Sequence, residues 1–318
     1  MTRNFLIAGG AGFLGSNLSA AVLAAGNSVV VVDNLITGNS ANIEHLRDNP
    51  RFTFIEADAD TARDIVGPFD VVLHFASPAS PPNYLANPIE TLHAGSNATE
   101  ALLDVARRDG SRFVLASTSE VYGDPHVHPQ TEDYWGNVNP IGPRSVYDEA
   151  KRYAEALTFA YHRHFSVNTG VLRLFNTYGP HMDLNDGRAV PAFAQAALAG
   201  RPIPLHGDGT QTRSLLYVDD LVAGVLAMAD SVDPGPINIG NTVELQLIEI
   251  AQMVTEICES NSPIETHPRP VDDPERRKPD ITKASEILGW APTIGIQEGL
   301  ERTIAWFKDA TTTTGGSR

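Results

Sequence analysis

Short apolar runs alternate with segments of helical periodicity over the first half of the chain. Apolar runs typical of buried strands occur at residues 4–8, 28–32, 52–56, 71–75 and 112–116. Between them, apolar side chains recur at helical spacing, first over 18–25 and later over 98–108. Strands that alternate with helices predict an α/β fold, with a doubly wound parallel sheet of Rossmann type covered by helices on both faces. Ligands of such sheets bind beyond the carboxyl ends of the strands, so site residues should follow the strands.

The first strand leads into a glycine turn with the spacing G-x-x-G-x-x-G, formed by Gly9, Gly12 and Gly15. Glycine permits the tight turn and the close approach of a pyrophosphate to the backbone, and the N-terminus of the following helix faces the phosphates. The second strand ends in Asp33, about 20 residues on. A carboxylate there accepts hydrogen bonds from the adenosine ribose and repels a 2′-phosphate. The spacing therefore predicts a dinucleotide site that takes NAD in preference to NADP.

A hydroxyl-rich segment, residues 117–123, follows the strand predicted at 112–116. It lies where a substrate should meet the nicotinamide, although capping and turn groups have the same composition. Downstream, Tyr147 and Lys151 lie four residues apart on a predicted helix and therefore share one face. A positive charge beside a phenol favours the phenolate, so Lys151, together with the positive ring of an oxidised nicotinamide, should lower the pKa of Tyr147 toward the range in which it acts as a base. Such pairs also occur on ordinary helix surfaces, and the accompanying motifs are what indicate chemistry here.

The composition disfavours several kinds of binding partner. With 23 basic and 39 acidic residues among 318, the net charge is −16, which disfavours nucleic acids and anionic membranes. No apolar run reaches the roughly 20 residues of a membrane span, and the first apolar stretch is too short for a signal peptide, so we expect a cytoplasmic protein. The single cysteine, Cys258, cannot form an internal disulfide. The histidine pairs at 126/128 and 162/164 have no evident third ligand, so we expect no metal site.

Two lobes are predicted. Residues 1–178 should form most of the NAD-binding Rossmann domain, and 214–229, with the pattern of a strand and a helix, should return to it. Residues 179–213 and 230–308 should build a smaller C-terminal α/β lobe that binds the substrate. The polar residues 309–318 are typical of a flexible tail.

The glycine turn, the segment 117–123 and the pair Tyr147-x-x-x-Lys151 together resemble the extended short-chain dehydrogenase/reductase superfamily. Further stretches narrow the resemblance to the UDP-glucuronic acid decarboxylase (UDP-xylose synthase) family. These stretches are residues 76–84, 123–125, 132–136, 139–144, 174–180, 185–188 and 272–280. The resemblance extends over residues 4–307.

The resemblance implies an internal redox cycle. NAD⁺ oxidises C4 of the glucuronic acid while Tyr147 removes the proton of the 4-hydroxyl, and the ketone formed β to the carboxylate lets carbon dioxide leave through an enolate. The keto-pentose is protonated at C5 and reduced by the same cofactor to UDP-xylose. Thr118 should bond the sugar near C4, and Ser119 and Glu120 should lie near C5 and the carboxylate. The implied catalytic residues are Tyr147, Lys151, Thr118, Ser119, Glu120 and Arg277.

The resemblance also implies which residues contact the ligands. For NAD they are Gly9, Gly12, Phe13, Leu14, Gly15, Asp33, Asn34, Thr37, Gly38, Asp58, Ala59, Ala76, Ser77, Ala116, Tyr147, Lys151, Thr177 and Arg188. For UDP-glucuronic acid they are Tyr84, Tyr161, Asn176, Arg213 and Arg277. Arg213 should bind the diphosphate through charge-assisted hydrogen bonds. Arg277 lies in a basic run that could simply be a solvated, charged surface segment. Because the chain as a whole is acidic, we favour binding of phosphate or substrate by this run. The helices at 98–106 and 150–161 should pair across a homodimer as a four-helix bundle.

Ser119 favours decarboxylation over the related reactions. Similar sugar-nucleotide dehydratases carry an aspartate at this position, where an acid is needed to expel a hydroxyl. A second carboxylate would repel the glucuronate, whereas serine can bond to it without that cost. A nucleotide-sugar 4,6-dehydratase or 4-epimerase remains the alternative. A non-catalytic, NAD-responsive binding protein is disfavoured, because it would not need Tyr147, Lys151 and Thr118 together.

Several positions depart from the family pattern. Ala94-Gly95 replaces Thr-Asn, His181 replaces an arginine, Asp183-Leu184 replaces Met-His, and His206 replaces a tyrosine at the uridine end. These changes cluster in stretches that the resemblance assigns to the cofactor and the nucleotide. We therefore expect weaker cofactor retention, which would let UDP-4-keto-pentose escape as a product beside UDP-xylose.

Overall fold

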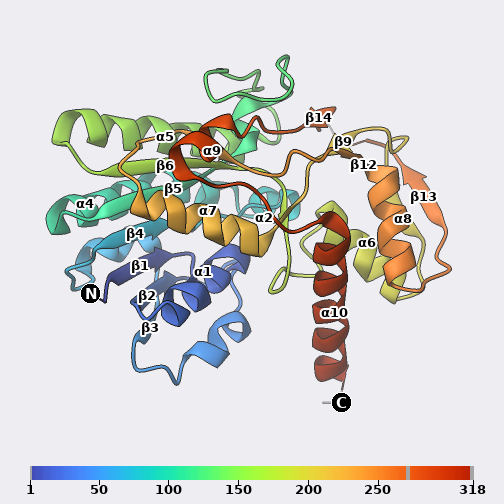
Figure 1. The fold of residues 1–318 in the computed structure, drawn as a ribbon, viewed down its shortest axis with the longest axis horizontal. Helices are drawn as coiled ribbons and strands as arrows, with labels where there is room; N and C mark the ends of the chain where they lie inside the picture. The colour runs from blue at the N-terminus through green and yellow to red at the C-terminus, as the bar shows by residue number, and fades with distance from the viewer. Residues whose placement is uncertain (1, 270–272, 316–318) are drawn as a thin grey trace.

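Seven parallel strands form the central sheet (Figure 1). The computed structural model describes residues 2–269 and 273–315, with side chains as far as residue 310. In sheet order the strands are β11 (Ile237–Ile239), β6 (Thr169–Leu174), β5 (Arg112–Thr118), β4 (Val71–His74), β1 (Asn4–Ala8), β2 (Ser28–Asp33) and β3 (Phe52–Glu56). The chain builds outward from β1 through β2 to β3, then returns to the other side of β1 with β4. The sheet order therefore reverses between β1 and β4, and ligands of doubly wound sheets bind at such a point.

Helices cover both faces of this sheet. The four long ones are α1 (Phe13–Ala24), α4 (Thr99–Asp109), α5 (Ser145–Phe165) and α7 (Val218–Asp230). Phe5 and Ile7 point to the face covered by α1 and α7, and their neighbours Leu6 and Ala8 point to the face covered by α4 and α5. Because both faces are buried, the strands are nearly continuous apolar runs, which is why they are easy to find in the sequence.

Short elements form the connections around the sheet. They are η1 (Ser40–Leu46), η2 (Ala59–Asp64), α2 (Pro81–Ala86), α3 (Pro88–His93), the π-helical η3 (Ala94–Ala98) and η4 (Ser119–Tyr122). The two-residue strands β7 (Thr177–Tyr178) and β10 (Leu216–Tyr217) pair with each other and carry the chain between the two lobes.

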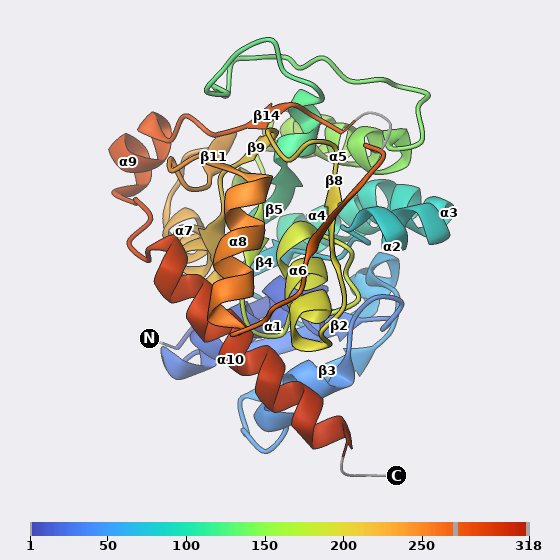
Figure 2. The same ribbon diagram turned by 90° about the vertical axis from the view of Figure 1, so that its right-hand side faces the viewer.

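The smaller lobe lies beside the carboxyl edge of the sheet (Figures 1 and 2). Its helices are α6 (Ala189–Leu198), α8 (Leu247–Ile257) and α10 (Ile296–Gly315). Its strands are β8 (Ile203–His206) with β13 (Ile264–His267), and β9 (Thr212–Arg213) between β12 (Leu245–Gln246) and β14 (Arg276–Arg277). The pairing of β14 with β9 brings Arg277 beside Arg213, although the two are far apart in the sequence.

The α/β fold and the strands predicted in the first domain are confirmed. Of 214–229, the helix α7 returns to the sheet and packs on β5 and β6, whereas β10 pairs with β7 in a separate two-stranded sheet. The boundary drawn at residue 230 is wrong, because β11 adds to the sheet beside β6 and α9 (Thr282–Leu288) packs on β11 and α7. The expected tail at 309–318 is also wrong in part, because α10 continues to Gly315; residues 316–318 lie outside the described chain. Nowhere in the described chain is a helix both long and apolar enough to cross a membrane.

Asp220 on α7 fixes the segment between α9 and α10. Its carboxylate accepts hydrogen bonds from the backbone N–H groups of Thr293 and Ile294 at 3.0 and 2.9 Å, and from the Thr293 hydroxyl at 2.7 Å. Its backbone carbonyl accepts a fourth bond from the Trp290 indole at 2.9 Å. Asp220 is 4% exposed, so water does not replace this acceptor readily.

Replacing Asp220→Ala should lower the free energy of unfolding by about 3 kcal/mol, because two backbone donors lose their acceptor in a buried place. Urea denaturation followed by circular dichroism measures this difference. Asp219→Ala is the matched control: the neighbouring carboxylate is 57% exposed and pairs with Arg302 at 3.5 Å, so its loss should cost under about 0.5 kcal/mol. Equal effects of the two substitutions would contradict the assignment.

Candidate active site

One large cavity, of about 1090 Å³, lies between the carboxyl edge of the sheet and the smaller lobe. All six predicted catalytic residues line it. The predicted NAD contacts that line it are Gly9, Gly12, Phe13, Leu14, Gly15, Thr37, Gly38, Ser77, Ala116, Tyr147, Lys151, Thr177 and Arg188. The predicted substrate contacts that line it are Tyr84, Asn176, Arg213 and Arg277. Residues from both lobes therefore face one space.

Six predicted residues do not line the cavity wall. They are Asp33, Asn34, Asp58, Ala59, Ala76 and Tyr161. Asp33 and Ala76 lie next to the wall residues Gly38 and Gly9, and Asn34 donates to the Asp58 carboxylate at 2.5 Å. Tyr161 is different and corrects the expectation of a substrate contact: its hydroxyl donates to Asp104 at 2.9 Å and its ring packs on Phe165 in the core behind the sheet. It shares a helix with Lys151, but it lies several turns away.

The glycine turn leaves room for nothing larger than hydrogen at two positions. A Cβ on Gly15 would stand 2.1 Å from the Gly9 carbonyl oxygen, and Gly9, at φ +80°, would meet the Ala76 backbone at 2.5 Å. The turn delivers the chain into α1, whose first turn carries no acidic residue and whose N-terminus has no side-chain cap within the described chain. Its N–H groups and positive dipole end are thus available to a phosphate. These features fit the diphosphate of a dinucleotide.

Asp33 organises the neighbouring loop. Its carboxylate accepts from the Ala11 and Leu35 backbone N–H groups, each at 2.9 Å, and a Cβ on Gly38 would approach it to 2.7 Å. Burial raises the pKa of Asp33 while these backbone bonds lower it. A carboxylate has about four acceptor sites, so it retains capacity for ribose hydroxyls. The arrangement fits NAD.

Tyr147 and Lys151 lie on α5 with their side chains buried. Lys151 Nζ donates to the Ala116 carbonyl at 2.9 Å and lies 5.8 Å from the centroid of the Tyr147 ring. The other face of that ring stacks on Tyr84 at 5.3 Å, and the Thr118 hydroxyl bonds the phenol. The shared helix face predicted from the spacing is confirmed.

The electrostatics of the pair differ from the sequence expectation. Burial raises the pKa of Tyr147 to about 12, and the hydrogen bond from Thr118 offsets only part of that rise. Burial also lowers the pKa of Lys151 to about 8, against the attraction of Glu155 one turn later. In the protein by itself, the removal of the phenol from water decides its pKa, and the lowering expected from Lys151 together with an oxidised nicotinamide stays a prediction.

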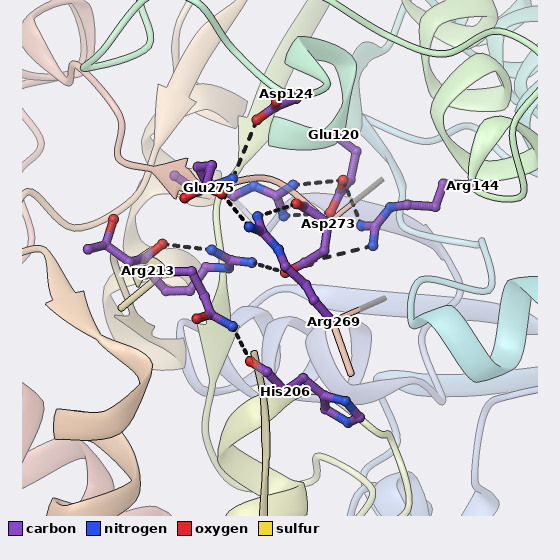
Figure 3. Close-up of polar contacts among 11 residues, drawn as sticks. Glu120, Asp124, Arg144, His206, Arg213, Arg269, Asp273 and Glu275 are labelled. Atoms are coloured by element: carbon purple, nitrogen blue, oxygen red, sulfur yellow. Dashed lines mark hydrogen bonds and ion pairs between the residues drawn. The ribbon is translucent and has the colours of Figure 1, made fainter. Parts of the chain in front are cut away.

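Glu120 is the centre of an ion-pair cluster (Figure 3). Arg277 donates to both of its oxygens at 2.5 and 2.8 Å, and Arg144 donates to one of them at 2.9 Å. Burial by itself would raise the pKa of Glu120, but the two guanidiniums outweigh it and lower the pKa to about 2. Glu120 is therefore a carboxylate at neutral pH, where it accepts hydrogen bonds and has no proton to donate.

Two further residues extend the cluster and were not assigned a role from the sequence. Asp273 accepts from Arg213 at 2.8 Å and lies 3.8 Å from Arg144. Arg144 and Asp273 both fall within stretches that resemble the decarboxylases, and this was the available signal. Three guanidiniums, from Arg277, Arg144 and Arg213, thus share two carboxylates at the cavity wall. The surplus of positive charge suits an anionic ligand.

Asp148, next to Tyr147, is a further titratable group that the sequence did not single out. Burial, followed by repulsion from Glu120, raises its pKa to about 7. One of its oxygens has no hydrogen-bond partner among the described residues, and neither has the Tyr84 hydroxyl. No group of three or more histidine, cysteine, aspartate or glutamate side chains in the described chain could hold a metal ion.

Residues 5–240 match the model of the NAD dependent epimerase/dehydratase family. UDP-glucuronic acid decarboxylase 1 of Danio rerio is 47% identical over 309 residues, which cover 96% of this chain and 72% of the relative.

Solved structures with nucleotide sugars or NAD have the same fold. UDP-glucuronic acid 4-epimerase from Bacillus cereus, in complex with UDP-glucuronic acid and NAD, has a TM-score of 0.87 and 28% identity, covering 96% of this chain and 99% of that one. dTDP-glucose 4,6-dehydratase from Streptomyces venezuelae, with NAD bound, has a TM-score of 0.88 and 27% identity, covering 98% of each chain. The matches extend over both lobes, and so over the whole cavity. The chain belongs to the NAD dependent epimerase/dehydratase family and, within it, to the UDP-glucuronic acid decarboxylases.

Proposed function

We propose that the protein decarboxylates UDP-glucuronic acid through a UDP-4-keto intermediate, using NAD in an internal redox cycle, and forms UDP-xylose. The observation that carries this proposal is the uncharged Ser119 between the buried Tyr147 side and the cationic cluster around Glu120. A sugar with its own carboxylate finds hydroxyl groups and guanidiniums there. The overall sequence identity to decarboxylases supports the same activity.

The chain's own residues supply the acid–base chemistry. When bound, NAD⁺ supplies the reversible oxidation that turns the C4 hydroxyl into a ketone. Tyr147 accepts the proton of that hydroxyl, and Thr118, already bonded to the phenol, orients both oxygens. Lys151 holds a positive charge near the ring and stabilises the phenolate as it forms. Burial makes the phenol a strong base once ionised, and the cost of ionising it must be met by charges brought in with the ligands.

The ion-pair cluster around Glu120 positions the carboxylate end of the sugar. Once the C4 ketone is present, the bond from C5 to the carboxylate breaks with its electron pair entering the enolate, and carbon dioxide leaves uncharged. Arg277 can hold the departing carboxylate, since it is fixed by two bonds to Glu120. Arg213 suits the diphosphate, because Asp273 and the Thr212 carbonyl hold its guanidinium at the cavity wall. The two anionic parts of the substrate therefore have separate partners.

We also propose that the protein is a homodimer. α3 packs on α5, and together they leave Ile89, Leu92 and Tyr153 exposed by 57%, 38% and 53%. Apolar side chains on neighbouring helices are suited to a bundle with a second copy, and α4 lies beside them. The mass of the protein in solution tests whether it is a dimer.

A cytoplasmic location is a further proposal, supported by the free thiol of Cys258, and cell fractionation tests it.

Incubation of the purified protein with UDP-glucuronic acid and NAD⁺ should release carbon dioxide and form a UDP-pentose, without net NADH. Carbon dioxide trapping and mass-resolved chromatography of the nucleotide sugars measure both products. The matched substrate control is UDP-glucose, which lacks the carboxylate and should not be consumed. Conversion of UDP-glucose to a 4-keto-6-deoxy sugar, or of UDP-glucuronic acid to its 4-epimer without carbon dioxide, would replace the proposal by the dehydratase or epimerase alternative.

Ser119→Asp should reduce kcat/KM for UDP-glucuronic acid on the order of 100-fold, because like charges in close contact cost several kcal/mol. Ser119→Ala removes the hydroxyl without adding charge and should reduce it by about 10-fold or less. Initial rates of carbon dioxide release compare the two variants. If the aspartate variant is as active as the alanine variant, charge at this position does not select the reaction.

Tyr147→Phe should lower kcat by about 10²–10⁴-fold, because the base is lost while the ring that stacks on Tyr84 remains. Since burial holds the Tyr147 pKa above the working range, the wild-type rate should rise with pH over the neutral range, and the residual rate of the variant should not. Tyr153→Phe, on an exposed side chain of the same helix, is the control. A Tyr147→Phe variant of near wild-type rate would exclude the phenol as the base.

A further inference from the structure

Three aromatic rings contact one another in a row between segments that are distant in the sequence, the first pair stacked and the second pair tilted by 50°. The ring of His45 on η1 stacks on His181 with centroids 5.7 Å apart and planes within 15°. The same His181 ring meets Trp306 on α10 at 5.4 Å. We call His45, His181 and Trp306 the ring ladder. It connects the first domain to the last helix through the loop that follows β7.

The ring ladder borders the cofactor end of the cavity. His181, Trp306 and Asn42 line the same cavity as the glycine turn and Gly38. Asn42 Nδ2 lies within hydrogen-bonding distance of two carbonyl oxygens, that of Ala11 in the glycine turn at 3.2 Å and that of His181 at 3.4 Å. Asn17 on α1 donates to the Pro180 carbonyl at 3.1 Å. The loop that carries His181 is therefore fastened to the segments that surround the expected diphosphate.

His181 takes an unusual backbone conformation to reach this place. Its φ is +69°, in the left-handed region that non-glycine residues seldom adopt. Such a conformation persists where surrounding contacts hold it, here the two rings and the Asn42 bond. Burial and the neighbouring His45 also lower the pKa of His181, so the stacked ring is neutral. The departure at this position thus places a ring where the family pattern has a charge.

α10 contributes the last ring of the ladder, that of Trp306. Figures 1 and 2 show it as a long helix whose C-terminal part extends beyond the rest of the smaller lobe, and Trp306 and Ala310 on that part line the cavity. The helix packs on α6 and α8. One contact between α10 and the first domain runs through His181 to His45, and His45 is exposed. A contact of this size can open without unfolding either lobe.

We propose that the ring ladder is a latch that retains the dinucleotide in the cavity through turnover, and so determines that the reduced pentose is the main product. This inference rests on the proposed function. If the reduced cofactor left before the ketone was reduced, the two electrons taken from C4 would leave with it, UDP-4-keto-pentose would be released, and each turnover would consume a new NAD⁺. A closed latch prevents this loss, which is the opposite of the weaker cofactor retention expected from the sequence departure at His181. His45, His181 and Trp306 act here as positioning residues and do not touch the reacting atoms.

The test uses the full chain with His45→Ala, Trp306→Ala and His45→Phe. Release of NADH without any sugar nucleotide is followed by stopped-flow fluorescence after mixing with excess NAD⁺. Loss of one aromatic contact should speed release by about fivefold in each alanine variant, whereas His45→Phe should keep a wild-type rate. His126→Ala, an exposed histidine away from the cavity, should also leave the rate unchanged.

The second readout is the product ratio with UDP-glucuronic acid. The two alanine variants should produce more UDP-4-keto-pentose, with a matching amount of NADH in solution, and His45→Phe should not. Because His45 is exposed, its alanine variant should fold normally, and circular dichroism verifies this. Wild-type release and product ratio in a folded His45→Ala variant would overturn the latch. A wild-type protein that releases no carbon dioxide would instead overturn the proposed function, while the NADH release rates would still test the latch.

Discussion

A single carboxylate joins the two halves of the molecule at the place where chemistry is expected. Glu120 lies in η4, the turn after β5, and Arg277 comes from β14, which the smaller lobe contributes. Their two-bond ion pair, with Arg144 as a third member, fixes the distance between the sheet edge and the lobe. Because the cluster is buried, removing Glu120 would leave the Arg277 guanidinium without its carboxylate, which is far more costly than losing a surface pair. The shape of the cavity therefore depends on this cluster.

Burial strengthens the ion pairs of the cluster, but it also raises the free energy needed to ionise Tyr147 in the acid–base step. Tyr147 and Lys151 lie where neither ionises in its usual range, and each is held by a neighbour, Thr118 for the phenol and the Ala116 carbonyl for the ammonium. With so high a pKa, the Tyr147 phenolate is a strong base, but only a small fraction of the phenol is ionised at neutral pH. The site thus favours proton transfer when a ligand supplies additional charge, and disfavours it otherwise. This dependence suits an enzyme that should oxidise C4 only in the complete complex.

The cavity also shows how one fold holds two ligands of different kinds. Its cofactor side consists of backbone: a glycine turn, a helix N-terminus and a loop held by Asp33. Its sugar side consists of charged side chains held in pairs. Backbone suits a constant dinucleotide, whereas side chains can change between relatives that act on different sugars. Ser119 is the clearest instance, since a single added carboxylate would reverse the preference for a uronic acid.

Much of this protein was determined by local patterns in its sequence. Strands buried on both faces are apolar throughout, and this pattern predicted the sheet. Glycine is required where backbone meets backbone, which predicted the glycine turn. Residues four apart on a helix share a face, which predicted the pair of Tyr147 and Lys151. Tyr161 shows the limit of that reasoning, because a shared helix does not reveal how many turns separate a residue from the cavity. Short segments such as β11 carry too little pattern to assign to a lobe.

Only the tertiary structure decided the long-range contacts and the energetics. The partners of Glu120 are 24 and 157 residues away, and the rings on either side of His181 come from opposite ends of the chain. The pKa of Tyr147 likewise depends on how completely water is excluded, which no spacing rule contains. The sequence by itself determined which residue types stand at the carboxyl edge of the sheet. Their charge states and partners were decided by folding, because both depend on what the rest of the chain places around them.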